Sequence, residues 1–299
     1  QKNNMNFAII KNRNFWLGTA VVYTTVALVS LGLWGLKVGI EYTGGSLLQV
    51  EYSNSIPSIA ALSDRLKGFD IGDAEIKQAG QHDMIFRFRD VSEETHQKIL
   101  AELKKDDAQL TEKTFESIGP IIGHELKTKS IWALVIALIL ICLYISFVFR
   151  KVSHPIASWK YGIVALVTLF HDVPFVLGLF AILGKFGGVE ITSTFIPAIL
   201  TVIGFSVHDT IVVFDRIREN LQKSRGAFED IVNTSINQTV VRSLNTSLTV
   251  LLVLTSIFFF GGESLKYFAL ALIAGIGIGT YSSIFIASPL LVVWHKWGN

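Results

Sequence analysis

Long apolar runs alternate with polar segments along this chain. A helix that crosses the hydrocarbon core of a bilayer needs about 20 mostly apolar residues. Runs of about this length predict transmembrane helices at residues 15–35, 130–149, 161–183, 192–214, 244–260 and 267–293. Because the number of spans is even, the polar tails at residues 1–14 and 294–299 are expected on the same side of the membrane.

The one long polar segment, residues 36–129, predicts a folded domain outside the bilayer. Alternation of apolar and polar positions is typical of half-buried strands, and apolar residues three or four apart are typical of helices. These patterns predict a strand within 40–52, a helix at 59–66, strands at 74–79 and 84–89, a helix from Ser92 and a strand at 110–118. This order predicts a ferredoxin-like α+β domain. Its histidines, His82, His96 and His124, lie in polar contexts and are expected on the surface.

Basic residues in the short loops predict the orientation, because loops rich in lysine and arginine stay in the cytoplasm. The N-terminal tail, the turn after the second span and the loop after the fourth span hold most of them, and Lys296 follows the last span. The opposite side offers only Lys185 and Lys266 in its short loops. We therefore expect both termini in the cytoplasm and the α+β domain outside. The first apolar run lacks a small-residue cleavage pattern, so it is expected to remain as an anchor.

Composition agrees with a membrane protein that also has a water-exposed part. Hydrophobic residues make up 51% of the chain, charged residues 17%, and the mean hydropathy is +0.49. The net charge of +2 is too small to indicate nucleic-acid binding. The single cysteine, Cys142, excludes a disulfide within the chain.

Three spans carry polar residues that lipid would not tolerate. A charged side chain near the centre of the bilayer costs about 2.5–3.5 kcal/mol on insertion scales, so it is expected to face protein, water or an opposite charge. The polar positions are His171 and Asp172 in the third span, Ser206, His208 and Asp209 in the fourth, and Gln238, Arg242, Asn245, Thr246 and Thr249 in the fifth. The fifth-span positions form one helical stripe, which predicts that the three spans face one another.

A structural alternative accompanies each of these residues. Asp209 is the first functional candidate, and a role as interhelical hydrogen-bonding residue is its alternative. For Asp172 neither interpretation is preferred, and for Arg242 snorkelling to the membrane interface is the alternative to an inward role. His171 and His208 are expected to position helices, with proton transfer as the alternative. Gly275 and Gly279 in the sixth span follow the small-xxx-small pattern and predict close helix packing.

Five stretches together resemble the SecF family of bacterial protein-export membrane subunits, within the resistance-nodulation-division superfamily. They are EYTGGSLL, HDV, GFSVHDTIVVFDRIREN, SINQTVVRSLNTSLTVLLV and ALIAGIGIGTYSSIFIASPLL. The resemblance extends from Met5 to about Leu291. It implies a polytopic helical protein of six spans with an outer domain after the first span, which is the layout that the apolar runs predict.

The resemblance also implies a function and partners. A SecF-like chain would work with SecD, as a separate or a fused partner, beside the SecYEG channel, and use the proton-motive force to help unfolded preproteins cross the bacterial inner membrane. It would be neither an enzyme nor dependent on a cofactor, with H⁺ as the coupling ion and Na⁺ as the alternative. The family pattern assigns the proton-carrying carboxylate to Asp209, its basic partner to Arg242 and supporting polar roles to Asn245 and Thr246, and we add Asp172 as a further proton-coupling candidate. Before Asp209 the family commonly has asparagine, where this chain has His208.

Other functional classes remain as alternatives. An ion-coupled exporter of small molecules or lipids would have the same layout, and a non-conducting scaffold of the translocon would need no titrating carboxylate. An intramembrane aspartyl protease needs two carboxyl groups that share a proton. Such proteases have glycine two residues before the second aspartate, where this chain has Val207.

Overall fold

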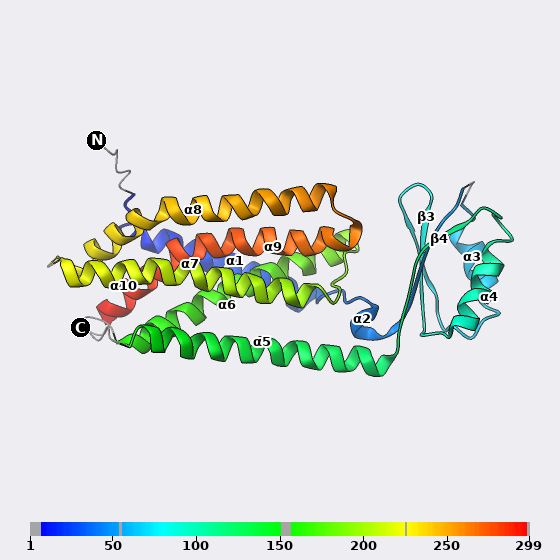
Figure 1. Ribbon diagram of the computed structural model, residues 1–299, viewed down its shortest axis with the longest axis horizontal. Coiled ribbons are helices and arrows are strands. Elements are labelled where there is room, and N and C mark those ends of the chain that lie inside the picture. The colour runs from blue at the N-terminus through cyan, green and yellow to red at the C-terminus, as the bar shows by residue number, and fades with distance from the viewer. Residues whose placement is uncertain (1–6, 54–55, 151–156, 225, 298–299) are drawn as a thin grey trace. The chain divides into compact units, whose positions relative to one another are not determined.

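A computed structural model of the chain describes residues 7–53, 56–150, 157–224 and 226–297. The chain divides into two compact units. One unit comprises Gln1–Lys37 and Trp132–Asn299, and the other comprises Val38–Ile131. The first is a bundle of long helices and the second is a small sheet with helices on one face (Figure 1).

Six helices in the described part of the chain are long and apolar enough to cross a membrane. They are α1 (Arg13–Trp34), α5 (Pro120–Val148), α6 (Ser158–Gly187), α7 (Phe195–Lys223), α8 (Phe228–Phe260) and a sixth built from α9 (Glu263–Ser282), the π-helical turn η1 (Ser283–Ala287) and α10 (Ser288–Trp297). Together with the sheet of the second unit, these helices confirm the predicted fold class.

Three of the six spans form the interior of the bundle and three lie on its periphery. In the apolar parts of α6, α7 and the sixth span, at least half of the residues are buried, whereas at most 17% are buried in α1, α5 and α8. Polar side chains on the interior helices must therefore find partners within the bundle, because neither water nor headgroups reach them.

Glycine allows the interior helices to approach closely. A Cβ atom added to Gly275 of α9 would lie 2.1 Å from Cγ2 of Val202 on α7, and one added to Gly279 would lie 3.0 Å from Cβ of Ser206. At Gly178 of α6, an added Cβ would lie 2.5 Å from Cα of Ala27 on α1. The small-xxx-small positions are thus packing positions, as predicted.

Helices α7 and α8 continue beyond the apolar runs at 192–214 and 244–260. Nε of Arg216 on α7 donates to Oε1 of Gln238 on α8 at 2.5 Å, and Nδ2 of Asn220 donates to Oγ of Ser235 at 2.8 Å. These hydrogen bonds between side chains join the two helices where apolar packing ends, so both helices extend as a polar hairpin.

The second unit has the predicted order of strands and helices. Its elements are α2 (Ile40–Thr43), β1 (Gly45–Glu51), α3 (Ile59–Leu66), β2 (Glu75–Ala79), β3 (Asp83–Phe88), α4 (Glu93–Leu103) and β4 (Thr111–Ile118). The sheet has the order β2-β3-β1-β4, and every neighbouring pair is antiparallel. Alternate residues of the central strands, including Leu48 and Phe86, are fully buried beneath α3 and α4, so the ferredoxin-like arrangement is confirmed.

The prediction of surface positions for the histidines of this domain is wrong for His96 and holds for His82 and His124, which are exposed. His96 is only 3% exposed. Its ring stacks on Phe115 with 3.6 Å between centroids, and its Nδ1 lies 3.1 Å from Oε1 of Glu93. The side chain is buried because it shares the inner face of α4 with Ile99 and Leu103, which follow it by three and seven residues.

Candidate functional site

Buried polar side chains gather on the three interior helices of the bundle and on the inward side of α8. Most of these side chains belong to α6, α7, α8 and the sixth span. They are Thr168, His171, Asp172, Ser206, Asp209, Thr210, Ser235, Thr239, Ser243, Ser247, Thr280, Ser282, Ser283 and Ser288. Two of them are carboxylates, and each has a different environment.

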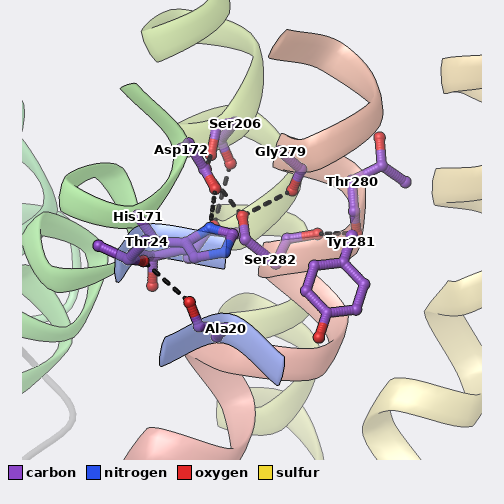
Figure 2. Close-up of polar contacts among 12 residues, drawn as sticks. Ala20, Thr24, His171, Asp172, Ser206, Gly279, Thr280, Tyr281 and Ser282 are labelled. Carbon is purple, nitrogen blue, oxygen red and sulfur yellow. Dashed lines mark hydrogen bonds and ion pairs between the residues drawn. The ribbon is translucent and has the colours of Figure 1, made fainter. Parts of the chain in front are cut away.

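Asp172 lies at the junction of α6, α7 and α9 and is completely buried. Oγ of Ser206 donates to its Oδ2 at 2.5 Å, and Oγ of Ser282 donates to the same oxygen at 2.7 Å. Nδ1 of His171 lies 2.9 Å from its Oδ1 (Figure 2). Ser206 and Asp209 are three residues apart and share one face of α7, but the hydroxyl group of Ser206 donates to Asp172 and not to Asp209.

His171 is the neighbour of Asp172 on α6 and is only 4% exposed. While Nδ1 contacts the carboxylate, Nε2 has no hydrogen-bond partner among the described residues. The ring of Tyr281 on α9 lies 6.2 Å from the imidazole ring, between centroids. The prediction that His171 positions helices accounts for Nδ1 but leaves Nε2 unexplained.

Asp209 lies on α7 and is 2% exposed. The hydroxyl groups of Ser243 on α8 and Thr280 on α9 lie beside its carboxylate, but Oδ2 makes no hydrogen bond with the described residues. Thr280 is already engaged, because its Oγ1 lies 2.6 Å from Oγ of Ser247. Asp209 is therefore buried while one of its carboxylate oxygens can still accept a hydrogen bond.

The predicted inward stripe on the fifth span lies on the outside of the chain. Arg242, Asn245, Thr246 and Thr249 are exposed, and Arg242 forms no ion pair within the described residues. The hydroxyl groups of the two threonines donate to backbone carbonyls one turn earlier on the same helix. The expectation that this stripe faces the third and fourth spans is thus wrong for these four residues in the chain by itself. Gln238, at the start of the stripe, does contact the fourth span, because its Oε1 accepts hydrogen bonds from Arg216 and Asn220 on α7.

A neighbouring face of α8, about 100° around the helix axis, supplies the inward polar groups. Thr239, Ser243 and Ser247 are buried and follow one another at intervals of four residues. This second stripe was available in the sequence but gives a weaker signal, because a serine or threonine hydroxyl group can bind a carbonyl oxygen of its own helix, as Thr239 does, and then needs no inward partner.

His208 also departs from its expected position. Its side chain is 64% exposed, and its Nδ1 lies 4.0 Å from Oδ1 of Asp209. The residue does not pack inside the bundle, because it precedes Asp209 on α7 and points toward the surface. The Asp209 carboxylate is consequently close to the periphery of this chain, in contrast to Asp172.

The described residues contain no group of three or more histidine, cysteine, aspartate and glutamate side chains placed to hold a metal ion. The buried ionisable side chains of the site are Asp172, His171 and Asp209.

Comparisons with known proteins identify the family. The family described as protein export membrane protein SecD/SecF, C-terminal, matches residues 97–297. Protein translocase subunit SecF of Thermobaculum terrenum is 45% identical over 281 residues, which cover 90% of this chain and 87% of the relative. Protein translocase subunit SecF of Anaerolinea thermophila is 37% identical over 97% of this chain and 96% of the relative.

Solved structures agree with the sequence relatives. The crystal structure of SecDF, a translocon-associated membrane protein from Thermus thermophilus, matches with a TM-score of 0.83 and 32% identity. A SecDF structure in a super-membrane-facing form matches with a TM-score of 0.70 and 31% identity. The match covers 97% of this chain but 39% of the Thermus thermophilus chain. With six spans, the ferredoxin-like domain and close relatives over nearly its whole length, this chain belongs to the SecD/SecF family of protein-export membrane proteins.

Proposed function

We propose that this chain is a SecF-type subunit of a protein translocase that promotes the export of unfolded preproteins across the bacterial inner membrane. The observation that carries this conclusion is the 45% identity to a protein translocase subunit SecF over 87% of that relative. A transport component with this layout is not expected to catalyse a chemical reaction of its own.

SecD is the proposed partner, either as a separate chain or fused to this one. The matched SecDF chain has more than twice the length that this chain covers, so the SecF-like part accounts for less than half of that chain. The exposed side chains of Arg242, Asn245 and Thr246 form a polar surface on α8 that hydrocarbon would disfavour. We assign SecD to this surface, with the SecYEG channel and the preprotein as further partners.

The orientation proposed from the basic loops places both termini in the cytoplasm and the α+β domain outside. Ion pairs support a common location for the two ends of the chain. Glu229, near the start of α8, lies 3.6 Å from Arg13 at the start of α1 and 2.5 Å from Lys296 near the end of α10.

In the proposed mechanism, Asp209 gains and loses a proton during the transport cycle. Desolvation favours the neutral form of a carboxyl group, and a nearby guanidinium favours the ionised form. Movement of Arg242 on α8 toward or away from Asp209 on α7 would therefore change the protonation of the carboxylate. Moving one charge through 100 mV is worth about 2.3 kcal/mol, enough to bias the arrangement of two helices.

The test measures proton flux in proteoliposomes that contain this chain together with SecD. Asp209→Asn and Arg242→Ala are expected to abolish flux, whereas the control variants Asp215→Asn and Arg218→Ala are expected to retain it. The controls suit the purpose because Asp215 and Arg218 lie on the same helix as Asp209 and pair with each other, at 3.1 Å.

The same samples distinguish the proposal from its alternatives. Wild-type flux in Asp209→Asn would refute the assignment of the proton carrier, and lower abundance of the complex with unchanged flux per complex would support a scaffold. Replacing the proton gradient by a sodium gradient tests which ion is coupled. Export of a preprotein, measured in parallel, separates a translocase subunit from an exporter of small molecules.

A further inference from the structure

The proposed function makes no use of His171 and Asp172, although they form the most completely buried ionisable pair in the described part of the bundle. They lie on α6, whereas the proposed proton carrier Asp209 lies on α7. Of the described side chains, Ser206 and Ser282 are the other hydrogen-bond partners of Asp172. The pair is thus a site distinct from Asp209. If its role were purely structural, every polar atom of the two side chains should have a hydrogen-bond partner.

The surroundings of Asp172 can satisfy both of its protonation states. In the ionised state, the hydroxyl groups of Ser206 and Ser282 donate to Oδ2 and the imidazole ring donates to Oδ1. Oγ of Ser282 also lies 3.0 Å from the backbone carbonyl oxygen of Gly279, a second acceptor for its single hydrogen (Figure 2). When Asp172 is protonated on Oδ1, Oδ2 can still accept from both serines, and Gly279 offers Ser282 a second acceptor, so no donor is left unsatisfied.

The position of Ser282 at the end of α9 favours this exchange. The π-helical turn η1 follows directly at Ser283. Such turns interrupt the regular helical hydrogen-bond ladder and occur frequently at functional sites.

Nε2 of His171 is the open position of this cluster. It is buried without a hydrogen-bond partner in the described residues, while Nδ1 is occupied by Asp172. An unsatisfied buried polar atom costs about 1–3 kcal/mol, which a purely structural residue would avoid.

Helix α1 packs against α6 and lies near His171 (Figure 2). Helices α1 and α6 run parallel and touch where Ala27 meets Gly178. Two turns earlier on each helix, His171 is level with Ala20 on α1. Figure 2 shows Ala20 and Thr24 of α1 at this level, with the hydroxyl group of Thr24 donating to the carbonyl oxygen of Ala20 at 2.9 Å.

The other groups around the pair are mostly uncharged. Helix α1 presents Thr24, helix α9 presents Tyr281 and Ser282, η1 begins with Ser283, and α7 presents Ser206 with Asp209 one turn further along. Among the described residues, no arginine or lysine pairs with Asp172. His171 is consequently the partner that can compensate the charge of the carboxylate.

We propose that His171 and Asp172 form a second proton-binding site in this chain, which exchanges its proton through Nε2 of His171 on the side of α1. In one step, a proton binds at Nε2 and gives an imidazolium ion. The Nδ1 proton then passes to Oδ1 of Asp172, which leaves a neutral imidazole protonated at Nε2 and a neutral carboxylic acid. One proton is gained, and the reverse sequence releases it. This inference rests on the proposed proton-coupled function.

The decisive variant is His171→Asn in the complex with SecD in proteoliposomes. An asparagine amide placed at the position of Nδ1 can still donate to Oδ1 of Asp172, but no atom replaces Nε2. The expected result is a complex of normal abundance that has lost proton flux. Wild-type flux in this variant would overturn the inference, because the open nitrogen atom would then be dispensable.

Infrared spectroscopy of the same complex gives a readout besides flux. Acidification should produce the carbonyl stretch of a protonated carboxyl group that Asp172→Asn removes and Asp209→Asn leaves in place. In His171→Asn the band should persist, but its shift after transfer to D₂O should be slowed. If no band depends on Asp172 at any pH where the complex is intact, the pair is structural and the inference fails.

These outcomes separate the inference from the proposed function. If Asp209→Asn abolishes flux and His171→Asn does not, the proposed function stands and the second site is refuted. If neither variant changes the flux, the proposed proton coupling fails as well.

Discussion

Close contact between α7 and α9 predicts that Gly275→Ala destabilises the bundle. The added Cβ would lie 2.1 Å from Cγ2, 2.7 Å from Cγ1 and 2.9 Å from Cβ of Val202. Carbon atoms in good contact are about 3.5–4.0 Å apart, so the shortest of these contacts must lengthen by more than 1 Å. Rotation of the valine side chain does not relieve the contact to its Cβ, so the two helices must separate.

The expected cost exceeds what alanine gains as a better helix former. Overpacking a tight contact costs typically about 1–3 kcal/mol. Replacement of glycine by alanine within a helix gains about 0.5–1 kcal/mol. Separation of α7 and α9 would also disturb the neighbouring hydrogen bonds of Ser206 and Ser282 to Asp172, which adds to the cost.

A matched control lies on the same helix. Gly277 has no atom within 4 Å of the position of an added Cβ. Thermal unfolding of the full chain in mild detergent should therefore give a lower midpoint for Gly275→Ala and an unchanged or higher midpoint for Gly277→Ala. The double variant Val202→Ala/Gly275→Ala should recover part of the loss, since Val202→Ala removes both Cγ atoms.

Equal midpoints for the two glycine variants would refute this argument. A double variant less stable than the sum of its single substitutions would also refute it, because the cycle measures the contact between the two residues directly.

Three further predictions concern other parts of the chain. Burial raises the pKa of Tyr52 to about 12 from its ordinary value of 10.0, so the outer domain should keep its stability below pH 10 and lose about 2–3 kcal/mol as the pH rises toward 12, which hydrogen exchange of β1 and β3 would measure. Asn237→Ala removes two hydrogen bonds to the backbone of Phe7, at 2.7 Å and 3.0 Å, and should increase amide exchange in the segment before α1. Ser282→Ala removes a donor from Asp172 and should lower the stability of the bundle by about 1 kcal/mol in thermal unfolding.

The controls for these predictions come from the same elements. Tyr52→Phe should remove the alkaline loss and leave stability at neutral pH unchanged or higher, because the buried hydroxyl group has no hydrogen-bond partner among the described residues. Asn245→Ala, an exposed substitution on α8, should leave exchange before α1 unchanged. Ser256→Ala, whose hydroxyl group binds its own helix, should leave the bundle as stable as before. Any control that behaves like its test variant would contradict the corresponding prediction.

The pattern of apolar residues was sufficient for the fold because length and periodicity determine it locally. A run of about 20 apolar residues has few structures available other than a transmembrane helix. The alternation Met84, Phe86, Phe88 likewise identifies one face of β3, and all three residues are buried. The ends of the helices were harder to predict from the sequence. Helices α7 and α8 extend beyond their apolar runs because side chains of one helix form hydrogen bonds with side chains of the other.

The direction that each polar stripe faces could not be predicted from one sequence. Helix α8 has polar residues on two faces, and the more polar one, with Arg242 and Asn245, is exposed while Ser243 and Ser247 point inward. The sequence argument assumed that every polar residue in a span faces this chain's own bundle. That assumption fails when part of the surface belongs to an interface with another chain.

His96 illustrates the same limit in the outer domain. Its polar neighbours in the sequence suggested exposure, but helical spacing places it on the same face as Ile99 and Leu103. Stacking on Phe115 and contact with Glu93 compensate for its burial. Periodicity was a better guide than local composition, because the fold of α4 decides which face is covered.

The two carboxylates of the bundle differ in how far their environment depends on the partner chain. Asp172 is surrounded by donors that this chain supplies itself, so its site is complete within the described residues. Asp209 lies near the exposed His208, and its proposed partner Arg242 is on the outer face of α8. An arginine exposed to hydrocarbon costs about 2.5–3.5 kcal/mol, which contact with polar groups of SecD would offset. Binding of SecD should therefore change the environment of Asp209 much more than that of Asp172. Of the two carboxylates, only Asp209 should then depend on whether the complex with SecD has formed.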